Sequence, residues 1–118
     1  RTLIVHARSA LLQGLLLSND TASWTAAHCP QHASVRSWLN TKATAYQQGD
    51  ITSLAFGYVR SMDWIDGVVV GVELLEQLHA NLQHFAAAPL THDEILDLQD
   101  SRPRVDIATL DPAQWSAL

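Results

Sequence analysis

The segment that most constrains the fold is residues 65–72, an apolar run that carries two glycines, Gly67 and Gly71. Most of its residues are valine or isoleucine, and from Gly67 onward no polar side chain interrupts the run. A strand with one face in water alternates apolar and polar residues, so this run is typical of a parallel strand that is buried on both faces. The chain then needs a second strand beside it and helices that cover it.

A second apolar run occupies residues 3–7, where Leu3, Ile4 and Val5 precede a leucine-rich stretch, residues 8–17. We interpret this run as a buried strand followed by a loop. Two parallel strands cannot be joined by a tight turn, and the 57 residues between the two runs leave room for helices on the crossover.

Helix signals fill the space between the two strands. Asp20 can cap a short helix over residues 22–28, and Asp50 can cap a helix that is apolar nearly all round and should therefore be well covered. Between them lies a helical stripe that stops near Gly49. The stripe consists of Val35, Trp38, Leu39, Ala43 and Tyr46.

Beyond the second strand, apolar residues recur at intervals of three and four and predict an amphipathic helix that ends before Pro89. Its stripe consists of Leu74, Leu75, Leu78, Leu82 and Phe85. Thr91 and Glu94 form a capping-box pattern before a further short helix, and Asp111 with Pro112 can begin a last turn around Trp115. The order of strand, helices, strand, helix and helix predicts an α/β fold with a parallel sheet.

With 118 residues, the chain can form one domain, which we take as a single unit over residues 1–118 with the tail 102–118 unassigned. Two apolar strands alone leave unpaired edges. We therefore expect a piece of a longer protein whose N-terminal part covers the strands, or else a homodimer in which copies of the chain pair.

Charge and composition argue against several classes of protein. The formal charge of −5 and the scattered basic residues argue against nucleic-acid binding, and no apolar stretch approaches the ~20 residues of a membrane-spanning helix. The single cysteine excludes an intramolecular disulfide framework and suits the cytoplasm. His28, Cys29 and His32 are metal-ligand types at close spacing, but no fourth ligand is evident, so we interpret them as a surface helix turn and predict no metal site.

Residues 9–16, residues 65–72 and the later residues Glu76–Leu78 and Asn81–Leu82 together resemble the C-terminal part of the aldo/keto reductase family. The resemblance runs from Leu3 to about Leu98 and matches strands seven and eight with the helices after each. It implies a helix-rich βαβα fragment of a TIM (β/α)8 barrel with two short parallel strands. It also implies NAD or NADP as cofactor and a small carbonyl substrate in the parent protein.

In the family, the loop after strand seven holds the cofactor pyrophosphate, which corresponds here to Ser9, Leu11, Gln13 and Gly14. A small residue lets backbone amides approach an anion, and Ser and Gln add hydrogen-bond donors. The alternative is that Gly14 only turns the chain and that Gln13 is solvated.

The resemblance assigns the adenosine end of the cofactor to the turn Gly71, Val72 and Glu73, with Asn81 on adenine and Gln77 one helical turn before it. Asn81 and Gln77 could equally be exposed helix residues. The chain departs from the family at Glu73, where a carboxylate would repel the 2′-phosphate of NADP.

A second departure is Arg8, which stands where many members have an aromatic residue stacked on the nicotinamide. In the family, the Asp, Tyr, Lys and His that supply the proton donor come from the early strands, and no matching constellation occurs in this chain. Apolar helical stripes account for Tyr46 and Tyr58, so we interpret neither as catalytic. We therefore expect a cofactor-binding part with no activity of its own. The alternative function is a non-enzymatic helical interaction module that forms a homodimer.

Overall fold

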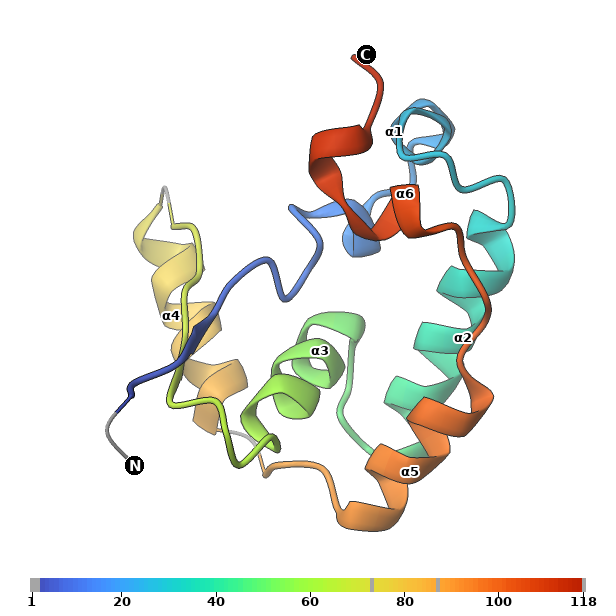
Figure 1. The fold of residues 1–118 in the computed structure, drawn as a ribbon. Helices are drawn as coiled ribbons and strands as arrows, with labels where there is room; N and C mark the ends of the chain where they lie inside the picture. The colour runs from blue at the N-terminus through green and yellow to red at the C-terminus, as the bar shows by residue number, and fades with distance from the viewer. Residues whose placement is uncertain (1–2, 73, 87, 118) are drawn as a thin grey trace.

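The computed structural model describes residues 3–72, 74–86 and 88–117. Helices dominate the chain, and only two short strands occur among the described residues (Figure 1). The elements in chain order are β1 (His6–Ala7), the 3-10 helix η1 (Leu15–Leu17), α1 (Thr21–Ala26), α2 (His32–Ala45), α3 (Ile51–Arg60), β2 (Gly67–Val68), α4 (Leu75–Ala86), α5 (His92–Ser101), α6 (Ile107–Leu110) and the 3-10 helix η2 (Pro112–Gln114).

The two strands pair in parallel, with His6 opposite Gly67 and Ala7 opposite Val68. Asp66 reinforces the start of the pair, because its Oδ2 accepts from the backbone N–H of Val5 at 2.7 Å. A Cβ atom at Gly67 would lie 3.2 Å from the His6 ring, so glycine permits this close approach. The predicted helix-rich α/β arrangement with two short parallel strands is thus observed.

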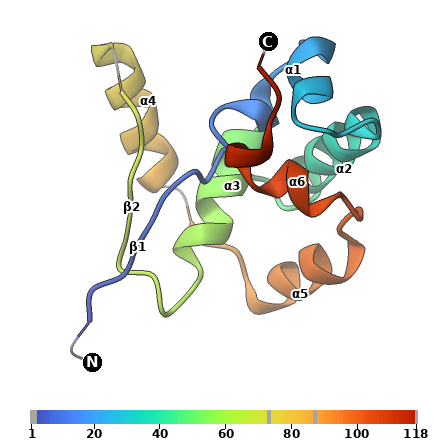
Figure 2. The same ribbon diagram turned by 45° about the horizontal axis from the view of Figure 1, so that its top comes forward.

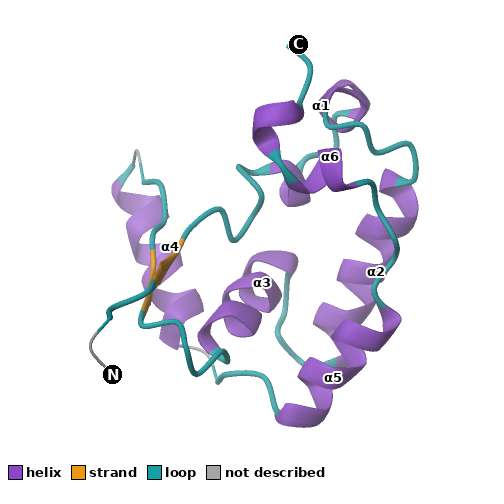
Figure 3. Ribbon diagram, in the orientation of Figure 1, coloured by secondary structure: helices purple, strands orange, loops and turns teal. Residues whose placement is uncertain are grey.

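The predicted lengths and burial of the strands are wrong. Each strand has two residues instead of spanning residues 3–7 and 65–72. Leu3 and Ile4 are 74% and 78% exposed, and Val69 is 58% exposed. An apolar run indicates that a strand must be buried by other parts of the protein, but it does not show which segments bury it. The described part of the chain supplies no third strand to extend the sheet (Figure 3).

The core lies between α2, α3 and α5 and extends to α1 (Figure 1). Its largest fully buried side chains are Trp24, Phe56, Leu54 and Cys29. The C-terminal tail closes over α1, where the backbone N–H of Ser116 donates to the carbonyl of Ala26 at 2.8 Å. The predicted stripe of α2 is confirmed, with buried residues Val35, Leu39 and Ala43.

The helix-start predictions are also confirmed. The side chains of Asp20, Asp50 and Asp111 accept from backbone N–H groups in the first turns of α1, α3 and η2. Thr91 and Glu94 form the reciprocal capping box of α5. Each cap satisfies donors that a helix cannot pair internally, so each fixes where its helix begins.

Helix α4 lies apart from the core, beside the strands and against α3 (Figures 1 and 2). The helix forms where the apolar stripe predicts it, but none of the residues of α4 is buried. Large apolar side chains from the segments around β1, β2 and α4 are exposed. They are Leu3, Ile4, Trp64, Val69, Val72, Leu74, Leu75, Leu78 and Leu82, which we call the apolar face.

Candidate functional site

A cavity of about 430 Å³ lies beside the strand pair, a size typical of small-molecule sites. The loop after β1 contributes Arg8, Ser9, Leu11, Gln13 and Gly14 to its lining. All five are residues that the resemblance assigned to cofactor binding. The loop therefore forms a wall of a cavity.

Gly71, just after β2, and Asn81 on α4 also line the cavity, and Asn81 adds a carboxamide to its polar groups. Seven of the ten predicted cofactor residues thus meet at one cavity. They come from the loop after β1, residues 8–14, and from Gly71 and Asn81, which lie more than 50 residues later. The parallel pairing of β1 with β2 places the two post-strand segments at the same edge. A shared edge at the carboxyl ends of parallel strands is the usual location of ligand sites in α/β proteins.

The loop after β1 has an unusual backbone. Leu12, Gln13 and Gly14 are consecutive left-handed residues with φ of 52°, 55° and 84°, and Ser9 has φ of 60°. Backbone bonds hold this geometry, among them Leu12 N–H to the Ser9 carbonyl at 2.8 Å. A Cβ at Gly14 would meet no atom within 4 Å, so Gly14 is required for its backbone angle and not for space. Left-handed non-glycine residues cost roughly 1–2 kcal/mol each and gather at functional sites.

Four polar side chains in the lining take no part in holding the fold. Arg8, Ser9 and Gln13 are exposed and Asn81 is half-buried. None of the four makes a hydrogen bond or ion pair with another described residue. A guanidinium, a hydroxyl and two carboxamides are therefore free to bind a ligand, and this set is rich in donors for phosphate oxygens.

The floor of the cavity is apolar. Phe56 of α3 is 2% exposed and lines the cavity together with Val69 and Val70. Its ring stacks on Phe85 of α4 at a centroid distance of 4.9 Å. Asn81 lies one helical turn before Phe85 on the same face of α4, so this aromatic pair fixes the position of Asn81 at the cavity.

A partly buried polar contact also fixes α4. Ser53 of α3 and His84 of α4 share a hydrogen bond of 2.6 Å between Oγ and Nδ1. Ser53 is 7% exposed, so this bond satisfies a hydroxyl that has little access to water. The contacts of Ser53 and Phe56 are not evident in the sequence, because α3 is apolar nearly all round and no periodic signal marks the two residues that face α4.

Three predicted site residues are not part of this lining. Val72 is 40% exposed and lies outside it. The Oε1 of Gln77 accepts from the backbone N–H of Leu74 at 3.2 Å, a bond at the N-terminus of α4. Glu73 lies outside the described residues.

His28, Cys29 and His32 each have a structural role. The Nε2 of His28 is 2.9 Å from the carbonyl oxygen of Gln114, and the His32 ring stacks on Trp24 at 5.9 Å. Cys29 is buried, and burial raises the pKa of its thiol. Among the residues that the structure describes, no three His, Cys, Asp or Glu side chains are placed to hold a metal ion.

Tyr46 and Tyr58, which we do not interpret as catalytic, both form hydrogen bonds with side chains of α5. The Tyr46 hydroxyl donates to Asp97, and the Tyr58 hydroxyl accepts from Gln99 Nε2 at 3.2 Å. Burial, and next the bond to Asp97, raise the pKa of Tyr46 far above its usual value. Neither tyrosine lines the cavity beside the strands.

Comparison of the chain with protein-family models, with curated proteins and with solved structures finds no match. No helix in the described part of the chain is long and apolar enough to cross a membrane. The candidate site therefore rests on its own geometry and chemistry.

Proposed function

We propose that this chain is the C-terminal, cofactor-binding part of an NAD(P)-dependent oxidoreductase of the aldo/keto reductase type, whose further strands complete a TIM (β/α)8 barrel. One observation carries the proposal. Residues that the resemblance selects from three separate segments, among them Ser9, Gln13, Gly71 and Asn81, line one cavity. The strand pairing brings the two post-strand segments together, and the polar residues that the resemblance selects from them face the same cavity.

The residues of the cavity suit the two polar parts of such a cofactor. Ser9 and Gln13 offer two neutral polar groups to a pyrophosphate, and the left-handed loop around Gly14 leaves backbone amides open to it. Arg8 stands at the nicotinamide position, where its guanidinium can stack on the ring. The Asn81 carboxamide offers both a donor and an acceptor, as the edge of adenine requires. When bound, the nicotinamide cofactor carries the hydride; these residues hold and orient it.

A titration of the 118-residue chain with NADH tests this proposal. We expect saturable binding, and we expect Arg8→Ala and Asn81→Ala each to weaken it about tenfold, since each removes a hydrogen-bonding group from the ligand. Gln83→Ala is the matched control, because Gln83 is exposed on α4 and does not line the cavity. Equal affinities of all four proteins, or no binding by a folded chain, would contradict the proposal.

The cofactor preference follows from charge. A carboxylate at Glu73 would repel the 2′-phosphate, so the proposal favours NAD over NADP. Glu73→Arg should strengthen NADPH binding and leave NADH binding nearly unchanged. If the substitution leaves NADPH affinity unchanged or weakens it, Glu73 does not face the 2′ position.

The alternative function is a non-enzymatic interaction module that forms a homodimer. The apolar face favours it, because exposed apolar patches mark association surfaces. NADH binding separates the two functions. Aldehyde reduction by the chain alone does not, because both predict background turnover in the absence of the family's proton donor.

A further inference from the structure

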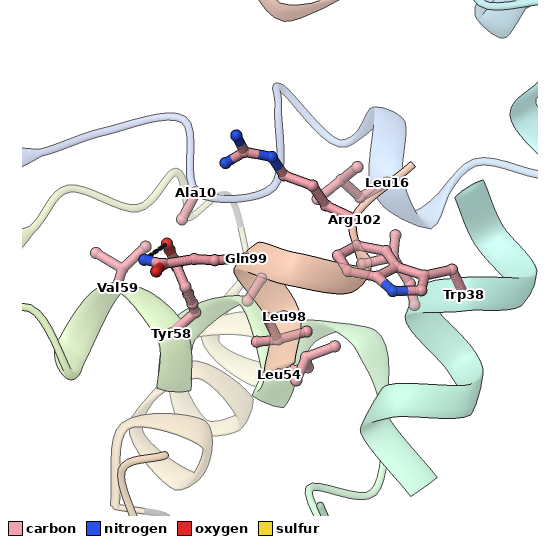
Figure 4. A pocket seen from close by; sticks show the side chains of 11 residues that line it. Ala10, Leu16, Trp38, Leu54, Tyr58, Val59, Leu98, Gln99 and Arg102 are labelled. Atoms are coloured by element: carbon pink, nitrogen blue, oxygen red, sulfur yellow. Dashed lines mark hydrogen bonds between the residues drawn. The ribbon is translucent and has the colours of Figure 1, made fainter. Parts of the chain in front are cut away.

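A second cavity, of about 220 Å³, lies between α2, α3 and α5 (Figure 4). It shares only Ala10 with the cavity beside the strands. Leu39, Leu54 and Leu98, which are 8%, 2% and 6% exposed, form much of its wall. The cavity is thus separate from the cavity beside the strands; it is half-open to solvent and adjoins a further hollow, with which it shares Leu39 and Arg102 among others.

The volume of this cavity suits a small ring. An apolar cavity of about 150 Å³ is sufficient for benzene. The cavity of about 220 Å³ therefore has room for a benzene-sized ring and one small polar substituent.

The polar groups that line the cavity indicate which substituent on the ring would bind best. Arg102, at the end of α5, extends its side chain over the cavity (Figure 4). Its guanidinium makes no hydrogen bond or ion pair with the described residues, and none of the described residues that line the cavity is a carboxylate; Asp100 lines only the adjoining hollow. A positive charge beside an apolar cavity favours an anionic ligand over a neutral or cationic one.

Tyr58 supplies a second donor. Its hydroxyl oxygen accepts from Gln99 Nε2 at 3.2 Å, so the hydroxyl hydrogen remains available for a ligand (Figure 4). A guanidinium and a hydroxyl can each donate to a carboxylate oxygen.

We propose that this cavity binds a benzoate-sized monocarboxylate, with its ring among Leu39, Leu54 and Leu98 and its carboxylate on Arg102 and Tyr58. The proposal does not depend on the proposed cofactor site. It concerns a ligand of different chemistry in a different cavity.

An NMR titration with sodium benzoate tests the proposal, with the four tryptophan indole N–H signals as reporters. Trp38 lines the cavity, and Trp64 does not. We expect the Trp38 signal, assigned with Trp38→Phe, to shift in a saturable manner while that of Trp64 stays fixed. A dissociation constant of about 1 mM or lower is expected, well within what a ligand of about nine non-hydrogen atoms can reach.

Arg102→Gln should weaken benzoate binding at least about tenfold, because it removes the charge that pairs with the carboxylate. Arg104→Gln is the matched control, since Arg104 is two residues away and does not line the cavity. Benzyl alcohol should bind the unmodified chain more weakly than benzoate. Arg102 is exposed, so its substitution should leave the fold intact, which the Trp24 and Trp115 signals will report. An unshifted Trp38 signal, or equal benzoate affinity in both variants, would overturn the proposal.

Discussion

Asp97 holds two helices together. Its Oδ2 accepts from Lys42 Nζ at 2.7 Å and from the Tyr46 hydroxyl, so an α5 carboxylate joins two side chains at the end of α2. The hydrogen bond from Lys42, and next that from Tyr46, hold the pKa of Asp97 below its usual value. The charged form of Asp97 is therefore the form that the fold stabilises.

Asp97→Asn should lower the melting temperature at neutral pH. A carboxyl with a depressed folded-state pKa adds stability above its unfolded pKa of about 4, and that stability is lost as the pH falls through the folded value. The difference between the two proteins should therefore shrink below about pH 4. Thermal melts from pH 7 to pH 3 measure it, with Asp100→Asn on the same helix as the control. A pH-independent difference would show that the charge of Asp97 is not involved.

The helices show how far local sequence determines structure. The starts of α1, α3 and α5 are correctly predicted because a cap involves residues within three positions of each other, as at Asp20, Asp50 and Thr91. The burial of Leu74 and Val69 is not correctly predicted, because burial depends on segments remote in sequence. A stripe of leucines predicts a helix and one apolar side, but not what contacts that side.

The residues that line the candidate site are predicted only in part. Its loop residues, such as Ser9 and Gln13, were selected by a family resemblance and not by periodicity, and they share one cavity. The cavity floor was missed. Phe56 looks like any other apolar residue of α3, and only the packing of α4 shows that it lines the cavity beside Asn81.

Shortening a leucine side chain to alanine should lower the stability of the protein much more on α3 than on α4. Leu54→Ala on α3 removes a side chain that is 2% exposed and should cost about 2–5 kcal/mol of unfolding free energy. Leu78→Ala on α4 removes one that is 41% exposed and should cost less than about 1 kcal/mol. Urea unfolding of both variants measures the two values. Similar large losses would mean that α4 is covered in solution.

The molecule as a whole exposes more surface than its mass requires. Its accessible area is 7734 Å². A compact monomer of 13.0 kDa would expose about 6,300 Å². The excess of about 1,400 Å² exceeds the ~800 Å² that one partner buries in a standard interface. Its radius of gyration, 14.6 Å, is likewise above the ~13.5 Å of a compact domain of this length.

We therefore predict that the 118-residue chain self-associates through the apolar face at micromolar concentration. Sedimentation should show a dimer or larger species. The double variant Leu78→Glu with Leu82→Lys should shift it towards monomer, because it places charges on exposed positions of α4 at a spacing that supports the helix. If the unmodified chain is a monomer in dilute buffer and unfolds cooperatively, and the double variant has the same mass in sedimentation, then the chain is stable with the apolar face exposed to solvent.

The proposed function requires that the loop after β1, the turn after β2 and α4 together hold the adenosine and pyrophosphate parts of a nicotinamide cofactor. The most direct measurement is a backbone NMR map of the chain titrated with ADP-ribose, which NAD contains. We expect saturable shifts at Ser9, Gln13, Gly14, Gly71 and Asn81. A folded chain in which these signals do not move, or in which the shifts occur only away from this cavity, would contradict the proposed function.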